Sequence, residues 1–337
     1  MHALVCREPG KLAFEERREP ERSPDEVLVQ IRRVGICGTD YHIYEGTHPF
    51  LNYPRVMGHE LSAEVLEAPA STGFSPGERV IVNPYLSCGS CHACRGGKPN
   101  CCMRIAVLGV HRDGGMCERL SLASGNLYPA GDLSLDAAAS VEFLAIGAHG
   151  VQRSGISRGT QSLIIGAGPI GLGAAIFAAI AGGKVTLMDR DASRLASSLR
   201  LAGAAGSILA DDHAAEAISA ATGGNGFDVV IDATGNRASM ENGFRYVAHG
   251  GTLVFLSVIR DDIVFSDAEF HKREMRLLAS RNALKADFDH VIASIALGHV
   301  PIEALVTHRT TLGGAVADLP RWAADKQGLV KAMIEIG

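Results

Sequence analysis

The sequence predicts an α/β protein that combines an irregular, β-rich region with a doubly wound parallel sheet, and two observations support this expectation. From residue 162 onward, short apolar runs alternate with alanine-rich helical stretches, which is typical of a parallel sheet. Residues up to about 122 are instead dense in glycine, proline, asparagine and cysteine, and residues 27–34 alternate apolar and polar side chains as a half-buried strand does. Because 337 residues exceed what one hydrophobic core usually organises, we expect two domains.

The composition favours a globular chain and argues against nucleic-acid or membrane partners. The chain is 47% hydrophobic and 20% charged, and its net charge of −5 comes from 37 acidic and 32 basic residues that are intermixed, without a basic stripe. The amino terminus becomes charged within seven residues and lacks the apolar core of a secretory signal, so we expect a cytoplasmic protein. Residues 159–183 carry no charge, but their seven glycines and one proline favour a buried βαβ unit over a membrane span.

The segment SLIIGAGPIG has the glycine spacing of a dinucleotide-binding turn between an apolar strand and a helix. Its glycines permit a tight turn, close approach of a pyrophosphate, and packing of helix on strand. The next expected strand ends in Asp189, about 20 residues onward, where a carboxylate can bind both ribose hydroxyls of NAD. We therefore predict a Rossmann-type site, although any α/β protein can contain a glycine-rich turn. Its predicted contacts are Gly166, Gly168, Pro169, Ile170 and Gly171.

Charged and polar residues beside this turn bear on the choice of cofactor. The Asp189 carboxylate would repel a 2′-phosphate, which favours NAD over NADP. Arg190 and Arg194 follow closely enough to weaken that preference, or they simply begin a solvated helix. Asp232 and Thr234 in VIDATG end another expected strand, and we predict that they line the cofactor crevice.

Clustered cysteines predict a structural metal site. Five of the eight cysteines occur between residues 88 and 102, which is too clustered for a disulfide framework in a chain of this length. Four thiolates in C-x2-C-x2-C-x7-C spacing can surround a tetrahedral zinc, whereas an iron–sulfur cluster usually has a shorter third gap followed by proline. Cys101 competes for the fourth ligand position. The predicted ligands are Cys88, Cys91, Cys94 and Cys102.

A second, scattered set of residues predicts another metal. Each of its members alone would usually be an ordinary core residue. Together they offer one thiolate, one imidazole and carboxylates, which suit a zinc ion that keeps a position open for water or substrate. The set comprises Cys37, Thr39 and His42 in GICGTDYH, His59 and Glu60 in VMGHE, and Glu142 in VEFLAIGAH.

Taken in order, these segments resemble the medium-chain zinc alcohol and polyol dehydrogenase family over essentially the whole chain. The resemblance implies an oxidoreductase that acts on CH–OH donors with NAD and carries two zinc ions per chain, one catalytic and one structural. It implies a discontinuous GroES-like catalytic domain, residues 1–145 and 284–337, and a Rossmann domain, residues 146–283. It also implies a homo-oligomer, a dimer or tetramer. The apolar run at residues 251–265 is expected to be an edge that could pair between subunits.

The resemblance further implies roles for individual residues. Cys37 and His59 would be zinc ligands, while Glu60 and Glu142 would share the remaining inner positions in an order that the sequence leaves open. Thr39 would relay the substrate proton and His42 would carry it outward, unless His42 is only a surface imidazole. Arg281 and Asn282 would contact the substrate, because guanidinium binds carboxylate bidentately; a surface ion pair is the alternative for Arg281.

Longer sequence segments resemble one branch of the family, the bacterial L-galactonate and L-gulonate 5-dehydrogenases. The resemblance is clearest in FSDAEFHKREMRLLASRN at residues 265–282. This implies oxidation of a secondary hydroxyl of a hexonate. Phe143 departs from that branch, which often has proline there, and this puts the Glu142 geometry in doubt. The alternatives are another polyol, threonine or simple alcohol dehydrogenase, or a non-catalytic protein that binds zinc and nucleotide. The motifs do not determine the stereochemistry of the substrate.

Overall fold

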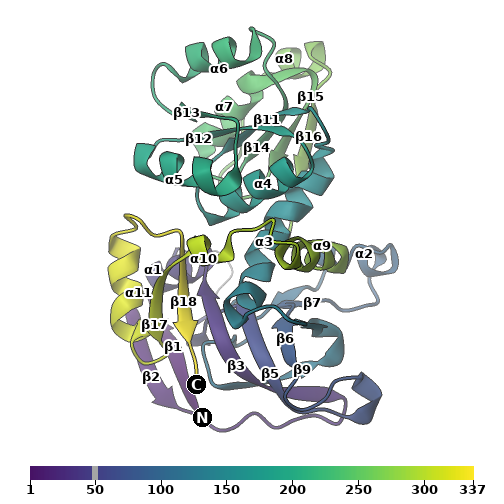
Figure 1. Cartoon of the computed structure of the whole chain (residues 1–337), viewed down its shortest axis with the longest axis vertical. Helices are drawn as coiled ribbons and strands as arrows, with labels where there is room; N and C mark the ends of the chain where they lie inside the picture. The colour runs from purple at the N-terminus through teal and green to yellow at the C-terminus, as the bar shows by residue number, and fades with distance from the viewer. Residues whose placement is uncertain (48–51) are drawn as a thin grey trace. The chain divides into compact units, whose positions relative to one another are not determined.

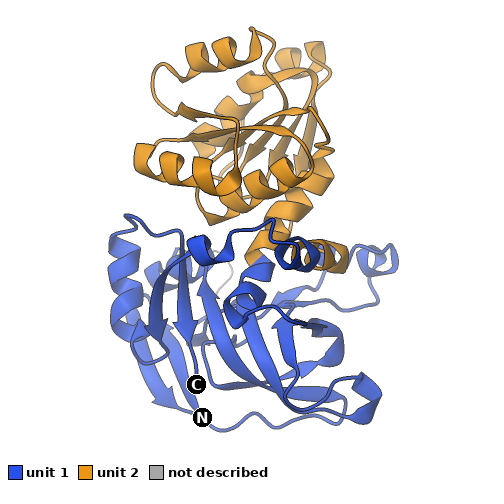
Figure 2. Cartoon of the chain, in the orientation of Figure 1, with its two compact units in different colours: residues 1–142, 292–337 blue, residues 143–291 orange. Residues whose placement is uncertain are grey.

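The computed structural model describes residues 1–47 and 52–337, which form two compact units (Figure 2). Unit 1 comprises Met1–Glu142 and Ile292–Gly337, and unit 2 comprises Phe143–Val291. Both boundaries fall inside helices, α3 (Leu135–Ser154) and α9 (Lys285–Ala296). Among the described residues, we find no helix with the length and apolar character needed to cross a bilayer.

Unit 1 is built on mainly antiparallel sheets, and buried apolar residues of their strands contribute to its core. A seven-stranded sheet has the order β10-β6-β5-β3-β18-β17, with β9 also paired to β3, and a three-stranded sheet has the order β2-β1-β4. The larger sheet contains β3 (Glu26–Ile36), β5 (Glu60–Glu67), β6 (Arg79–Val82), β9 (Arg119–Ala123), β10 (Leu127–Pro129), β17 (Val306–Thr311) and β18 (Lys331–Glu335). The smaller one contains β1 (His2–Glu8), β2 (Lys11–Glu16) and β4 (Arg55–Val56). Because β18 pairs with β3, the C-terminal segment returns to the N-terminal region, as expected (Figure 1).

Short helices and a small lobe complete unit 1. The helices are α1 (Gly38–Glu45), α2 (His92–Arg95), α10 (Ile302–Leu305) and α11 (Ala315–Ala324), with single 3-10 turns at Ala70–Thr72, Pro99–Cys101 and Ser124–Asn126. The cysteine-rich lobe projects from a two-stranded sheet of β7 (Tyr85–Leu86) and β8 (Ala106–Val107) (Figure 1). This sheet joins the two ends of the lobe to the rest of the unit.

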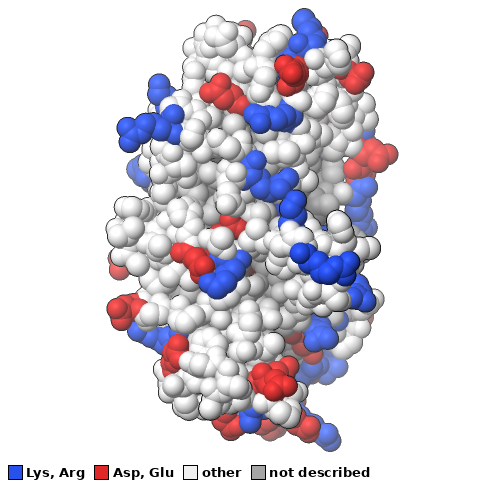
Figure 3. Space-filling view, turned by 90° about the vertical axis from the view of Figure 1, so that its right-hand side faces the viewer, with Lys and Arg blue, Asp and Glu red and all other residues white. Residues whose placement is uncertain are grey.

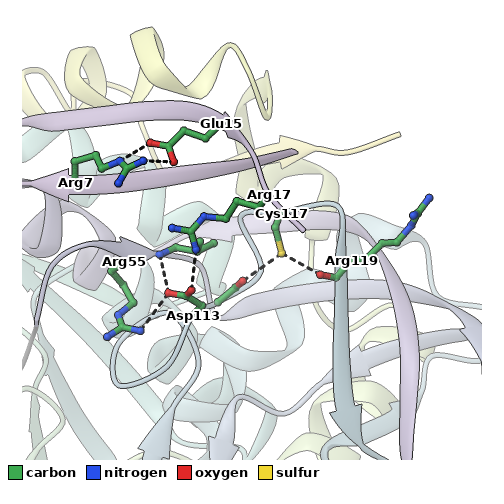
Figure 4. Close-up of polar contacts among 9 residues, drawn as sticks. Arg7, Glu15, Arg17, Arg55, Asp113, Cys117 and Arg119 are labelled. Atoms are coloured by element: carbon green, nitrogen blue, oxygen red, sulfur yellow. Dashed lines mark hydrogen bonds and ion pairs between the residues drawn. The ribbon is translucent and has the colours of Figure 1, made fainter. Parts of the chain in front are cut away.

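A loop carboxylate ties the three-stranded sheet to the segment that precedes β9. Asp113 accepts hydrogen bonds from Arg17 (3.2 Å), Arg55 (3.1 Å) and the Val56 backbone (3.1 Å) (Figure 4). Nearby, the buried Cys117 thiol contacts two backbone carbonyl oxygens, and burial raises its pKa to about 12. Cys117 therefore acts as an ordinary buried thiol.

Unit 2 is a six-stranded parallel sheet with the order β13-β12-β11-β14-β15-β16, the doubly wound order of dinucleotide-binding folds. Its strands are β11 (Gln161–Ile165), β12 (Lys184–Asp189), β13 (Gly206–Leu209), β14 (Phe227–Asp232), β15 (Val247–Phe255) and β16 (Arg276–Ala279). Its other helices are α4 (Pro169–Ile180), α5 (Ala192–Ala202), α6 (Ala214–Thr222), α7 (Arg237–Tyr246) and α8 (Asp267–Lys272). The predicted fold class is confirmed. Acidic and basic side chains both occur on the face of each unit that Figure 3 shows.

Two details of the sheets differ from the sequence-based expectation. The run at residues 251–265 does not provide a sheet edge, because β15 pairs with β14 on one side and β16 on the other. The edge strand on this side of the sheet is β16. The parallel pair of β17 and β18 was also not predicted, because β17 is largely polar and β18 begins with Lys331.

Candidate metal centres and nucleotide site

A buried aspartate fixes the two loops that carry Cys37 and His59. Cys37 is the N-cap of α1, directly after β3, and Asp40 in the first turn is fully buried. Asp40 accepts hydrogen bonds from the backbone N–H of Cys37 (2.9 Å) and of Gly58 (3.2 Å). Gly58 has φ +90°, and a Cβ there would approach Val34 to 2.8 Å, so glycine is required. Burial raises the Asp40 pKa, an effect that His59 and the two N–H groups oppose.

Cys37, His59 and Glu60 form a buried group with one potential ligand atom of each within 4.8 Å of the others. His59 Nδ1 lies 4.0 Å from Asp40 Oδ1 and has no hydrogen-bond partner among residues 1–47 and 52–337. Burial by itself would lower the His59 pKa, but a hydrogen bond with Cys37 and the charges of Asp40, Cys37 and Glu142 raise it well above its ordinary value. An imidazole surrounded by anionic groups is a suitable place for a cation.

Lys331 neutralises Glu60, a contact that the sequence did not reveal. Lys331 Nζ lies 2.7 Å from both Glu60 oxygens and donates to the Ile36 carbonyl at 3.3 Å. The two side chains are 1% and 0% exposed. The available signal was a lysine directly before the apolar run AMI. Glu60 therefore lies beside Cys37 and His59, as predicted, but already holds a buried counter-ion.

Glu142 lies on α3 and is nearly fully buried. Its Oε1 accepts a hydrogen bond from the Tyr85 hydroxyl, whereas its Oε2 has no partner in the described part of the chain. Burial and the nearby Glu60 raise the Glu142 pKa to about 7, despite the opposing effects of His59, Tyr85 and Lys331. Glu142 is outside the 4.8 Å group but interacts electrostatically with His59.

The two predicted proton-relay residues lie on α1. Thr39 Oγ1 is 3.9 Å from Cys37 Sγ, so its hydroxyl is beside the buried group. The His42 side chain is largely exposed, and its Nδ1 lies 3.1 Å from Thr47 Oγ1 and 3.7 Å from Glu45. The order Cys37, Thr39, His42 thus runs from the buried group toward solvent.

The four predicted structural ligands also come together. Their sulfur atoms lie within 4.8 Å of one another, with Cys91 Sγ 3.5 Å from Cys94 Sγ and 3.9 Å from Cys102 Sγ. The backbone N–H groups of Cys88 and Arg104 each donate to Cys102 Sγ at 3.3 Å. A hydrogen bond from Arg104, with further help from backbone groups, lowers the Cys88 pKa to about 5. Cys102, and not the exposed Cys101, completes this group, which suits a closed four-thiolate zinc site.

The glycine turn has the geometry that a dinucleotide requires. β11 ends at Ile165 and α4 begins at Pro169, with Gly166 at φ +95° between them. A Cβ on Gly171 would overlap the Gly166 carbonyl oxygen, so only glycine lets helix and turn pack this closely. The remaining turn residues, Gly168 and Ile170, stand at the N-terminus of α4, where backbone N–H groups can face a phosphate.

Asp189 ends β12 beside this turn. Its Oδ2 accepts from Ala167 N–H (2.7 Å) and its Oδ1 from Asp191 N–H (2.9 Å), while Arg194 Nη1 lies 3.6 Å from Oδ1. These contacts hold the carboxylate next to the glycine turn, and they place a compensating cation beside it.

The other predicted unit 2 residues have more local partners. The buried Asp232 carboxylate accepts from Thr234 N–H (2.9 Å), Thr234 Oγ1 (2.7 Å) and Ser239 Oγ (2.6 Å), so it organises the turn after β14. Thr234 itself packs near Gly166. Arg281 and Asn282 follow β16, with Arg281 exposed and Asn282 at φ +53°.

Comparisons with known proteins show which family the chain resembles over its length. A model of the alcohol dehydrogenase GroES-like domain matches residues 23–132, and a model of zinc-binding dehydrogenases matches residues 169–296. The L-galactonate-5-dehydrogenase of Escherichia coli K12 is 40% identical over 341 residues, covering 99% of this chain and 98% of that protein.

Solved structures extend the likeness to cofactor complexes. The crystal structure of a Sinorhizobium meliloti 1021 protein bound to NADP is 29% identical, covers 99% of both chains and has a TM-score of 0.90. A short chain alcohol dehydrogenase of Escherichia coli CFT073, crystallised with NADH, is 28% identical, covers 100% of this chain and 99% of that chain, and has a TM-score of 0.92.

Proposed function

Because this chain belongs to the zinc-binding alcohol dehydrogenase family and is thus an oxidoreductase acting on CH–OH donors, we propose that its substrate is a hexonate such as L-galactonate or L-gulonate. The secondary hydroxyl at C5 is oxidised reversibly to a ketone, and the hydride passes to NAD. The proposed substrate class is supported by the end-to-end similarity to L-galactonate-5-dehydrogenase. Unit 1 serves as the catalytic zinc-binding domain and unit 2 as the NAD-binding domain, in a dimer or tetramer.

The observation that carries the proposal is the buried donor set of unit 1. Cys37 offers a thiolate, His59 an imidazole, and Glu142 a buried oxygen without a partner among the described residues. This combination fits zinc with an exchangeable fourth position, while the four-cysteine lobe fits a second, structural zinc. When bound between Cys37 and His59, zinc supplies Lewis-acid polarisation that lowers the pKa of the substrate hydroxyl.

The residues of α1 move the proton. Thr39 Oγ1, beside Cys37, would accept the proton that leaves the substrate hydroxyl while it gives up its own hydroxyl proton toward His42. A bound nicotinamide would accept the hydride from the same carbon. His42 then passes the proton to solvent, because its ring is exposed and an imidazole can both accept and donate a proton. Asp40 acts indirectly by holding the backbone of the Cys37 and His59 loops.

Unit 2 residues select the cofactor and orient the substrate. The Asp189 carboxylate beside the glycine turn accepts the adenosine ribose hydroxyls and repels a 2′-phosphate, which supports NAD as the preferred cofactor. Arg194, 3.6 Å away, weakens this repulsion. Thr234 contacts the glycine turn, and Asp232 holds Thr234 in place. Arg281 and Asn282 bind the hexonate carboxylate and neighbouring hydroxyls.

A substrate panel tests the proposal. The purified protein is incubated with NAD or NADP and with hexonates, polyols, threonine or ethanol, and the formation of reduced cofactor is followed by absorbance. We expect the highest kcat/KM for a hexonate with NAD. Turnover confined to polyols, threonine or a simple alcohol would place the enzyme elsewhere in the same family. Absence of any turnover, together with one bound zinc per chain, would favour the non-catalytic alternative.

A further inference from the structure

The two buried glutamates next to Cys37 and His59 have opposite surroundings. Glu60 has both oxygens occupied by a cation, and Glu142 has one oxygen occupied by a neutral hydroxyl and the other without a partner in the described residues. The difference decides which carboxylate is available to a metal, a question that the motifs leave open.

Lys331 holds Glu60 from a strand of the same sheet, with β3 between the two strands. It begins β18, which pairs antiparallel with β3, and its Nζ reaches both Glu60 oxygens at 2.7 Å. A third contact, to the Ile36 carbonyl, fixes the ammonium group. Moving Glu60 toward a metal would leave this ammonium buried without its counter-ion, and burial of an unpaired charge is strongly unfavourable.

Tyr85 holds Glu142 in a way that leaves one carboxylate oxygen available to bind a metal. Its backbone is fixed, because its N–H donates to Asn83 Oδ1 (3.0 Å) and its carbonyl accepts from Asn126 Nδ2 (3.2 Å). Its hydroxyl donates to Glu142 Oε1, which sets the orientation of the carboxylate. A hydroxyl adds no charge, so the negative charge of Glu142 remains available at Oε2.

We propose that Tyr85 and Lys331 are positioning residues that assign different roles to the two glutamates. Tyr85 presents Glu142 Oε2 to a metal held by Cys37 and His59, while Lys331 retains Glu60 as its ion-pair partner. The inference rests on the metal site of the proposed function and adds the two residues that decide its carboxylate ligand. Glu142 is the resting ligand, and Glu60 stabilises the surrounding strands.

Cobalt binding tests the proposed role of Tyr85 without a measurement of enzyme activity. Cobalt titrations report the affinity of the site and, by visible absorption, its ligands; the spectrum of Cys37→Ser is subtracted to remove the four-cysteine lobe. We expect Tyr85→Phe to weaken cobalt binding by about 10- to 100-fold, as loss of a partner of a metal ligand typically does. Glu142→Gln should weaken it at least as much, and the double variant Tyr85→Phe/Glu142→Gln should add little further.

A matched tyrosine provides the control for a lost hydroxyl. Tyr53 also lies in unit 1, and its hydroxyl donates to the Ile43 carbonyl instead of a glutamate. Tyr53→Phe should therefore bind cobalt with wild-type affinity and spectrum. Equal affinities and spectra for wild type, Tyr85→Phe and Tyr53→Phe would overturn the proposal.

A double variant that removes both charges tests the proposed role of Lys331. Glu60→Gln/Lys331→Met removes both members of the ion pair and leaves no buried charge unpaired. We expect it to keep the wild-type cobalt spectrum, whereas Glu142→Gln changes that spectrum. Loss of cobalt by the double variant to the same extent as by Glu142→Gln would overturn the assignment. If the wild-type protein binds a single metal ion, in the four-cysteine lobe, both the proposed function and this inference fail. If the wild-type protein binds two metal ions, the variants test the inference about Tyr85 and Lys331 alone.

Discussion

Replacing Lys331 with methionine should destabilise unit 1, because it leaves the Glu60 carboxylate buried without a counter-ion. Lys331 Nζ lies 2.7 Å from each carboxylate oxygen, and the side chains are 1% and 0% exposed, so water cannot take over the contact. Breaking a buried ion pair by removing one partner typically costs about 3–5 kcal/mol, and we expect a loss of unfolding free energy in this range.

The same structure predicts recovery when both charges are removed. Replacement of a whole buried ion pair is often neutral or stabilising, so Glu60→Gln/Lys331→Met should be about as stable as the parent protein. As a control, Lys11→Met removes an exposed lysine of the same unit that pairs with Glu8, and it should leave the unfolding midpoint unchanged.

The single tryptophan of the chain provides the assay. Trp322 is buried on α11 in unit 1, so its fluorescence follows unfolding of that unit in urea. All variants are compared in a Cys37→Ser background, so that a released Glu60 finds no metal as an alternative partner. A midpoint for Lys331→Met equal to that of the parent would refute the reasoning, as would a double variant that is as unstable as Lys331→Met.

Three further predictions follow from the sites. Gly171→Ala should weaken NADH binding and lower the stability of unit 2 by about 1–3 kcal/mol, because the added Cβ would overlap the Gly166 carbonyl. NADH fluorescence titration measures the binding, and urea unfolding measures the stability. Unchanged NADH binding would argue against the turn as the cofactor site. Asp189→Asn should weaken NAD binding and improve NADP binding, measured as the ratio of their dissociation constants; an unchanged ratio would remove Asp189 from cofactor selection. In metal-free protein, the folded-state pKa of Glu142 is raised from 4.5 to about 7, so the folded state binds the extra proton and stability should fall by about 3 kcal/mol as pH rises through that window. Glu142→Gln should lack this fall, and an identical pH dependence in both proteins would contradict the assignment.

Local patterns were enough to predict the parallel sheet and its glycine turn. A buried parallel strand is a short apolar run, so β11, β12, β14 and β15 are visible in the sequence, and the requirement for glycine at Gly166 and Gly171 is set by neighbouring backbone. The four-cysteine spacing was equally informative, since its ligands lie within 15 residues of one another along the chain.

Contacts between distant segments explain what the sequence did not reveal. Lys331 lies 271 residues from Glu60 and Tyr85 lies 57 residues from Glu142, so no local pattern could pair them. Asp40 was within a recognised motif, but its role depends on the Gly58 backbone of another loop. The run at residues 251–265 was misjudged as an edge because apolar character does not distinguish a central strand from an exposed one.

We propose that NAD oxidises the hydroxyl of a sugar acid at a site where Cys37 and His59 would hold zinc as a Lewis acid. The most direct measurement is the rate of NADH formation from L-galactonate and L-gulonate by protein whose zinc content has been determined. We expect two zinc ions per chain and turnover of at least one of these hexonates. Protein that holds two zinc ions, forms NADH readily from a simple alcohol and forms none from either hexonate would contradict it.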